Sequence, residues 1–194
     1  MSLTMERCKW CNLKNPLYIK YHDEEWGRPN FEEKYLYEML ILESFQAGLS
    51  WECVLNKRED FRKAYDNFDI DKVCRYDNKK IQELLSNEKL IRNKLKINAS
   101  INNSKIFKKI QNEYGTFYEY LKGFTNDKII YENDKTTSEL SDNISEDLRK
   151  RGMKFVGSTI IYSYLQAIGI IYSHDEECFM NKKASLRSSI KCKF

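Results

Sequence analysis

The chain has 194 residues, enough to bury a sizeable core as one domain or as two closely packed lobes. Hydrophobic residues make up 41% and charged residues 32%, a balance typical of soluble globular proteins and not of disordered ones. The formal net charge of +4 excludes a basic field over the whole surface, so a surface that attracts an anionic partner must be a local patch. No apolar run approaches 18 residues and the start lacks a signal-peptide pattern, which predicts a cytoplasmic protein with no membrane partner.

We expect a single domain over residues 5–178, with two packed helical lobes as an alternative arrangement, and a monomer. Residues 1–4 are expected to be a cloning remnant or a disordered start, and residues 179–194 a polar, basic tail without clear periodicity. Six cysteines would allow three disulfides, but in a cytoplasmic chain of this size reduced thiols or metal ligands are favoured.

Helical periodicity dominates the first third of the chain. Asn30-Phe31-Glu32-Glu33 has the spacing of a capping box with Asn30 as N-cap, and the apolar stripe that follows predicts a helix that Gly48 ends. Ser50 is expected to cap a second helix, which continues through Tyr65 and ends before Asp69.

The rest of the chain also predicts helices. Asp69 and Asn78 are expected caps of two short helices; longer ones are expected from about Arg92 to Gly115, at Phe117–Phe124, from Asp142 to Arg151 and from Ser158 to about Tyr172. Residues 125–141 are rich in Asn, Asp and Thr and predict an exposed loop. Because no segment alternates apolar and polar residues convincingly, we predict an all-α fold.

A basic turn with two glycines joins the last two predicted helices. Gly152 can take the left-handed conformation after a helix, and Gly157 lets the backbone approach a ligand before Ser158 starts the next helix. The apolar residues of the turn would anchor it, leaving backbone N–H groups and the cations Lys150, Arg151 and Lys154 for a DNA phosphate. The alternative is an ordinary helix corner whose basic residues are simply solvated.

The turn is similar to the helix-hairpin-helix of base-excision glycosylases. Most members of that superfamily place a catalytic Asp in the helix after the hairpin, whereas residues 158–173 of this chain contain no Asp or Glu. Either the resemblance is false or the chain is a member that works without that residue.

The chain has only two histidines, and each is close to a cysteine. His174 and Cys178 are four residues apart, which would place both on one face of a helical turn, and Cys8 precedes His22 near the other terminus. Together they complete a Cys2His2 set for one structural zinc ion that would join the two ends of the chain. The alternatives are buried free cysteines and hydrogen-bonded core histidines, and Cys11 competes with Cys8.

Several blocks in the same order resemble the type I 3-methyladenine DNA glycosylases. They extend from about residue 5 to 178 and include Glu6-Arg7-Cys8-x-Trp10, Pro16-Leu17-Tyr18-Ile19-x-Tyr21-His22-Asp23-x-Glu25-Trp26-Gly27, Leu42-Glu43-x-x-Gln46-Ala47-Gly48-Leu49-Ser50-Trp51, Lys57-Arg58-Glu59 and Lys150-Arg151-Gly152-x-Lys154-Phe155-Val156-Gly157. The resemblance implies a helix-hairpin-helix glycosylase bundle whose termini are joined by zinc on Cys8, His22, His174 and Cys178. It also explains the missing Asp, because this family lacks it. Cys11 departs from the family pattern.

Glu43 attracts notice before any family is named. It lies on the apolar face of its predicted helix, where a carboxylate is costly to bury without a partner or a ligand. A structural Glu paired with an Arg or capping another helix is the alternative. The resemblance implies instead that Glu43 hydrogen-bonds the amino edge of the excised base, that Tyr21 contacts the base, and that Trp10 and Trp51 are aromatic walls. Tyr18 is a weaker candidate.

The resemblance therefore implies a monofunctional enzyme that hydrolyses the N-glycosidic bond of 3-methyladenine and leaves an abasic site, without strand cleavage. Its partner would be double-stranded DNA with a flipped alkylated base, in a bacterial-type, nucleoid-associated setting. The hairpin and the Gly48-Leu49 turn would contact the DNA. The alternative is a non-catalytic, zinc-stabilised DNA-binding module. A glycosylase with an iron–sulfur cluster is disfavoured because its closely spaced C-terminal cysteines are absent.

Overall fold

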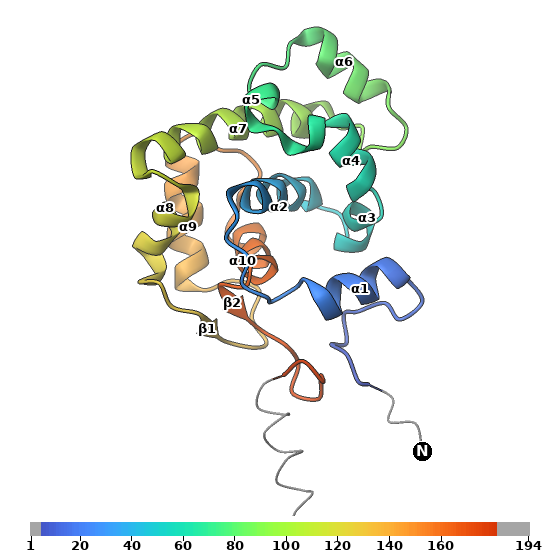
Figure 1. Ribbon diagram of the computed structural model, residues 1–194, viewed down its shortest axis with the longest axis vertical. Coiled ribbons are helices and arrows are strands. Elements are labelled where there is room, and N and C mark those ends of the chain that lie inside the picture. Colours follow the sequence, from blue (N-terminus) through green and yellow to red (C-terminus); the bar gives the residue numbers. More distant parts are fainter. Residues whose placement is uncertain (1–4, 182–194) are drawn as a thin grey trace, which may run out of the picture.

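The part of the chain that the computed structural model describes, residues 5–181, is a bundle of helices around one buried helix (Figure 1). The expected start at residues 1–4 and residues 182–194 of the expected tail lie outside the described residues. The elements are α1 (Pro16–Glu24), α2 (Glu33–Gln46), α3 (Trp51–Leu55), α4 (Arg58–Ala64), a short turn at Asp66–Phe68, α5 (Ile70–Val73), α6 (Asn78–Ser86), α7 (Lys94–Tyr114), α8 (Phe117–Thr125), β1 (Ile130–Tyr131), α9 (Glu139–Lys150), α10 (Ser158–Ala167) and β2 (Ile171–Tyr172).

The helix α2 is the centre of the bundle. Every residue from Leu36 to Phe45 is buried, including the carboxylates Glu38 and Glu43. The helix contacts α3, α7, α8 and α10, so the stretch from Leu36 to Phe45 has no solvated face (Figure 1). A polar side chain in such a helix needs a partner or a ligand, because an unpaired buried charge is costly.

The expected capping box at the start of α2 is wrong. The helix begins at Glu33, and the Asn30 carboxamide instead accepts a hydrogen bond from the Glu32 backbone N–H at 3.2 Å, outside the helix. The expected stop is confirmed. Gly48 has φ +76°, a left-handed conformation that glycine adopts without steric cost.

Between α2 and α7 the chain forms shorter helices than expected. Ser50 caps α3 by accepting from the Cys53 N–H at 3.2 Å, as predicted, but α3 and α4 are separate helices with a break at Asn56–Lys57. The cap of α5 is Asp69, as predicted. The predicted cap Asn78 is instead the first residue of α6, and Asp77 caps that helix. The helix α1, which begins after the Asn15 cap, was not predicted.

The helices α7 and α8 confirm the sequence prediction. The 21-residue α7 starts at the Asn93 cap and ends at Gly115, whose φ is +88°. Thr116 then caps α8. None of the described helices is both long enough and apolar enough to cross a membrane.

The end of the chain departs from the predicted all-α fold. Ser138 caps α9 in place of Asp142, and α10 ends at Ala167, shortly before Gly169, whose φ is +78°. A Cβ at Gly169 would lie 2.3 Å from the Pro29 nitrogen, which accounts for glycine there. The residues that follow form β2, which pairs in parallel with β1 inside the expected loop. The fold is therefore mostly helical with one very short two-stranded sheet.

Candidate functional site

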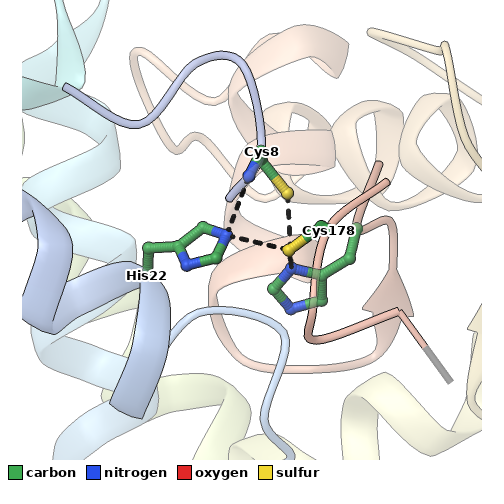
Figure 2. A group of neighbouring side chains, drawn as sticks. Cys8, His22 and Cys178 are labelled. Atoms are coloured by element: carbon green, nitrogen blue, oxygen red, sulfur yellow. Dashed lines mark hydrogen bonds between the residues drawn. The ribbon is translucent and has the colours of Figure 1, made fainter. Parts of the chain in front are cut away.

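Two cysteines and two histidines from opposite ends of the chain meet in one buried cluster (Figure 2). One ligand atom from each of Cys8, His22, His174 and Cys178 lies within 4.8 Å of all the others. The Cys8 Sγ–His174 Nδ1 and Cys178 Sγ–His22 Nε2 distances are both 3.4 Å, and Cys178 Sγ lies 3.6 Å from His174 Nδ1. A tetrahedral zinc site holds such atoms about 3.3–3.8 Å apart. The cluster therefore has the donor set and the size for one metal ion.

The cluster joins the two ends of the described chain. Cys8 precedes α1 and His22 lies within it, while His174 and Cys178 follow β2. The latter pair lies on a turn and not on the expected helix, with the Cys178 N–H donating to the Asp175 carbonyl at 2.9 Å. The turn still directs both side chains into the cluster.

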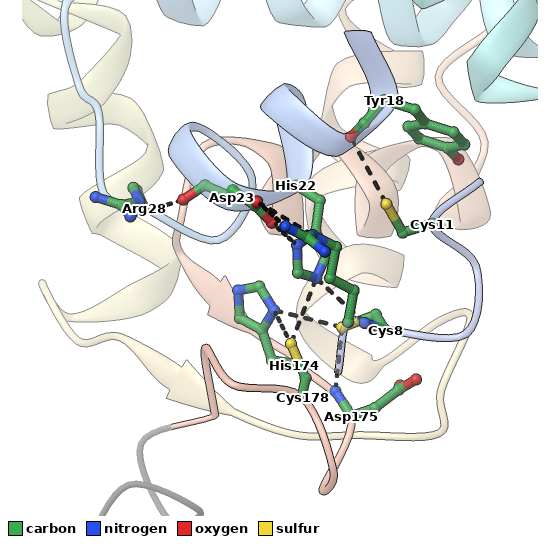
Figure 3. A network of polar contacts seen from close by, with 10 residues as sticks. Cys8, Cys11, Tyr18, His22, Asp23, Arg28, His174, Asp175 and Cys178 are labelled. Carbon is green, nitrogen blue, oxygen red and sulfur yellow. Dashed lines mark hydrogen bonds and ion pairs between the residues drawn. The ribbon is translucent and has the colours of Figure 1, made fainter. Parts of the chain in front are cut away.

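Surrounding residues orient the two rings (Figure 3). The Asp23 carboxylate lies 2.8 Å from His22 Nδ1 and is held by the Arg7 guanidinium at 2.7 Å, so that His22 Nε2 faces the cluster. Gly27 lies behind His174, and a Cβ there would lie 3.1 Å from the Nε2 atom of that ring. This close approach, together with a φ of +72°, accounts for glycine at that position.

The structure separates the two N-terminal cysteines. Cys8 belongs to the cluster, whereas the Cys11 thiol turns to the Tyr18 carbonyl at 3.8 Å (Figure 3). Hydrogen bonds from Cys8, His174 and His22 lower the pKa of the Cys178 thiol. A thiolate is the form of cysteine that binds a metal ion.

A cavity of about 330 Å³ lies beside this cluster. Its volume is at the small end of the range for small-molecule sites. The predicted residues Trp10, Tyr21, Glu43 and Trp51 all line it. The other lining residues are Tyr18, Trp26, Gln46, Asp134, Lys135, Ser163, Gln166, Ser173 and Asp175.

Two tryptophans lie between the cavity and the cysteine–histidine cluster. The Trp10 ring is 5.2 Å from the His22 ring, the Trp26 ring is 4.7 Å from the His174 ring, and the two indoles are 4.7 Å apart. The cluster thus supports the cavity wall directly.

Glu43 has no protein partner in the described residues. Its side chain is 2% exposed, its Oε2 atom accepts no hydrogen bond, and burial raises the pKa of the carboxyl well above its ordinary value. The contrast is Glu38 on the same helix, which lies 2.5 Å from Arg58 and 2.8 Å from Arg62. The structural role that an Arg-paired Glu would have therefore belongs to Glu38.

Two further polar atoms in the cavity wall are buried without partners among the described residues. They are Gln46 Oε1 and Trp51 Nε1. The Trp51 ring lies 5.3 Å from the Tyr21 ring, and burial raises the pKa of the Tyr21 hydroxyl well above its ordinary value. A cavity with an acceptor on Glu43, an indole donor and electron-rich rings can bind a planar polar base, and a cationic one best.

Part of the wall was missed by the sequence analysis. Gln46 follows Glu43 by one helical turn, a spacing that places both on one side of α2, so its presence could have been predicted. Ser163 and Gln166 come from α10, and Lys135 comes from the loop after β1, where it is paired with Glu132 at 2.5 Å. No local pattern brings these residues to Glu43.

The Gly48-Leu49 turn follows Gln46 directly and is exposed. Leu49 retains 41% of its accessible surface, and its N–H donates to the Gln46 carbonyl at 2.6 Å. The turn adjoins the cavity without lining it. The exposed Leu49 side chain is available to a partner.

The turn between α9 and α10 is anchored by buried Met153 and Val156, while Phe155 is half-buried. Gly152 has the predicted left-handed conformation, with φ +98°. Gly157 has an ordinary φ of −63°, and nothing in the described chain lies within 4 Å of an added Cβ, so this side of the turn is open.

The three cations of the turn differ in their surroundings. Lys150 pairs with Glu146 at 2.8 Å. Arg151 pairs with Glu113 and Asp147, so its guanidinium is already engaged within the protein. Lys154 is exposed and has no ion pair in the described part of the chain. Of these residues it is the most accessible to an external anion.

Backbone N–H groups at the turn complete this surface. The N–H of Lys154 donates to Asn103, but those of Phe155, Val156 and Gly157 have no acceptor within residues 5–181. They precede the N-terminus of α10, where the helix dipole also favours an anion.

Comparison with known proteins agrees with this geometry. The sequence profile of the methyladenine glycosylase family matches residues 10–181. DNA-3-methyladenine glycosylase 1 of Escherichia coli is 40% identical over 180 residues, which cover 90% of this chain and 96% of that protein. A crystal structure of 3-methyladenine DNA glycosylase I superposes with a TM-score of 0.87 at 36% identity, covering 91% of this chain and 100% of the other. A structure of the Staphylococcus aureus enzyme, described for its recognition of 3-methyladenine, gives a TM-score of 0.85 at 31% identity, covering 90% of this chain and 96% of the other. The chain therefore belongs to the methyladenine glycosylase family.

Proposed function

We propose that this protein hydrolyses the N-glycosidic bond of 3-methyladenine in alkylated DNA and leaves an abasic site. The observation that supports this most strongly is Glu43, a buried carboxylate without a partner in the described chain that lines a cavity with three of the predicted aromatic residues. The function named for the relatives agrees with this site.

Recognition depends on the positive charge that N3-methylation gives to adenine while the base is attached to its sugar. The rings of Trp10, Tyr21 and Trp51 attract a cationic base by stacking and cation–π interaction. Glu43 accepts a hydrogen bond from the amino edge of the base. The charge of the base also favours the ionised carboxylate, offsetting the burial that raises its pKa. Neutral adenine gains neither charge interaction.

Hydrolysis needs little assistance from the protein because the cationic base is a good leaving group. The bond between C1′ and the base breaks, its electron pair neutralises the base, and a water oxygen bonds to C1′ and releases a proton. The helix α10, which follows the hairpin, contains no Asp or Glu, in agreement with a reaction that lacks a strong general base. Lys135 in the cavity wall is paired with Glu132, so we propose no Schiff-base chemistry and no strand cleavage.

Access to the cavity requires the damaged nucleotide to leave the DNA stack, at a cost of a few kcal/mol. We propose that the α9–α10 turn is a helix-hairpin-helix that binds backbone phosphates through Lys154 and the open amides of residues 155–157. The exposed Gly48-Leu49 turn beside the cavity would contact the DNA at the site of the extruded base. Lys150 and Arg151 would add positive charge near the phosphates.

We also propose that Cys8, His22, His174 and Cys178 hold one structural zinc ion. The donor set, the tetrahedral spacing and the Asp23 carboxylate behind His22 all suit zinc. When bound, the ion would supply cross-linking and not chemistry, since four protein ligands leave no open coordination position. The ligand residues would then hold Trp10 and Trp26 in the cavity wall.

The proposal is tested by incubating the protein with methylated duplex DNA and identifying the released bases by chromatography. We expect 3-methyladenine in the supernatant and abasic sites that break only after alkali treatment. Binding to methylated DNA without release of any base would instead support a non-catalytic DNA-binding module. Strand breaks without alkali would show that the protein has lyase activity, contrary to the proposal.

A further inference from the structure

Lys96 is a buried cation outside the cavity wall. It lies in the first turn of α7, is 7% exposed, and donates from Nζ to the carbonyls of Phe45 at 2.9 Å and Ala47 at 2.6 Å. These carbonyls are at the end of α2, where no intrahelical donor is available. Burial lowers the pKa of the Lys96 ammonium, so its location has an electrostatic cost. A buried lysine is uncommon unless its donors are used, and here they are used on one short segment.

The same ammonium also reaches the hairpin. Its Nζ atom lies 6.0 Å from the centre of the Phe155 ring, within the range of cation–π attraction. Phe155 itself has φ +55°, a conformation that side-chain-bearing residues rarely adopt. The ring therefore lies toward Lys96 on a backbone that is unfavourable by itself.

About two helical turns further along α7, Asn103 binds the hairpin backbone directly. Its side chain accepts from the Lys154 N–H at 2.9 Å and donates to the Lys154 carbonyl at 2.8 Å, and it is fully buried. The helix α7 thus contacts both exposed segments, the loop after α2 through Lys96 and the hairpin through Asn103. The distance between those two segments is set by α7.

We propose that Lys96 is a positioning residue, which fixes the Ala47–Ser50 loop against the hairpin so that the two segments engage a duplex together. This inference rests on the proposed function, because it assigns the loop and the hairpin to the DNA surface. Lys96 does not line the cavity and is largely buried, so it acts on duplex docking and base extrusion and not on base binding. A residue that only capped the end of α2 would instead affect free-base binding, DNA binding and excision alike.

The test compares Lys96→Met with Lys94→Met, its exposed neighbour on α7. In Lys96→Met we expect excision from saturating methylated duplex to fall about tenfold or more in single-turnover kinetics, since a displacement of about 1 Å at a reacting site costs up to 10²-fold. Free 3-methyladenine, followed by tryptophan fluorescence, should bind within about twofold of the parent, and the salt dependence of DNA binding should keep its slope. Lys94→Met should excise at the parental rate when DNA is saturating.

Three results would overturn the inference. Parental excision by Lys96→Met would show that the loop needs no such support. A shallower salt slope would make Lys96 a phosphate contact, and a loss of free-base binding would make it a general support of the fold. If Lys96→Met does not fold, Lys96→Arg keeps the charge and the donors, and should bind free base normally while excising more slowly; parental excision by it would equally overturn the inference. Absence of excision by the parent protein would contradict the proposed function separately.

Discussion

At the scale of single residues, Glu38 and Glu43 are both buried in α2, and their surroundings give them opposite properties. Glu38 faces two guanidinium groups, so its charge is balanced within the protein. Glu43 faces a cavity and forms no ion pair within the described residues, and the Lys135 ammonium in the cavity wall is paired with Glu132, so the charge of Glu43 is balanced only when a cationic ligand binds. The protein therefore holds an unfavourable group in its centre, which is typical of a functional site.

Glu43→Gln should lower activity and raise stability together. The substitution keeps the shape of the cavity but removes the charge that favours a cationic base, so excision should fall and the preference for free 3-methyladenine over adenine should shrink. At neutral pH the variant should be more stable by about 1–3 kcal/mol, since it no longer buries an unpaired ionisable group. Thermal unfolding and base release from methylated DNA measure the two effects.

The pH dependence has a definite sign. Burial raises the pKa of Glu43, so between its ordinary value and this raised value the folded state binds more protons than the unfolded state, and stability falls as pH rises. The advantage of Glu43→Gln over the parent should therefore be small near pH 4 and should grow toward neutral pH. Glu38→Gln is the matched control and should lose stability at neutral pH, because it breaks the pair with Arg58. Parental excision by Glu43→Gln would show that the carboxylate is structural.

The pattern of apolar residues singled out Glu43 but left a structural, Arg-paired role open, and it missed that Glu38 is buried as well. The base-recognition role of Glu43 came from the resemblance to a family. The metal ligands could be predicted as residue types, since only two histidines exist, but spacing left Cys8 and Cys11 as alternatives. Only the folded chain brings one of the two thiols to the histidines.

At the scale of elements, glycines in left-handed conformations defined the helix ends that could be predicted, at Gly48, Gly115 and Gly152. The end of α10 was predicted too late, at about Tyr172, because the apolar sequence continues past Gly169, although that glycine is also left-handed, with φ +78°. Contacts distant in sequence accompany this end: β2 pairs with β1, and the backbone of Arg28 and Pro29 packs on Gly169. The far wall of the cavity depends on the same distant contacts.

The hairpin is the element that should bind DNA without reading its sequence. Lys154→Ala removes an exposed cation beside the open amides, so it should weaken binding to all duplexes alike and reduce the salt slope by about one. Lys34→Ala is the control. Lys34 is an exposed lysine near the start of α2, and its replacement should change binding little. Titrations at several salt concentrations measure both. A loss confined to one DNA sequence would contradict backbone binding.

At the scale of the whole molecule, the cluster of Cys8, His22, His174 and Cys178 joins the two ends of the described chain. Two hydrogen bonds accompany it, from the Phe179 N–H to the Glu6 carbonyl and from the Lys9 N–H to the Asp175 carboxylate. The first ligand precedes α1 and the last follows β2, so the cluster closes most of the described chain into one loop. The same cluster supports Trp10 and Trp26 in the cavity wall. Stability and base binding should therefore depend on the same four residues.

Metal analysis should find one zinc ion per chain, and Cys8→Ala should lose it. A cross-link between chain ends contributes about 2–5 kcal/mol when a disulfide makes it, and zinc that binds only the folded state should act in the same direction. In a chain of this size that corresponds to a fall in Tm of about 4–20 °C. Because the cluster supports the two indoles, binding of free 3-methyladenine should weaken as well.

Cys11→Ala is the matched control and should keep its zinc, since Cys11 faces the Tyr18 carbonyl and not the cluster. Full zinc retention in Cys8→Ala, with loss in Cys11→Ala, would show that the N-terminal ligand is Cys11.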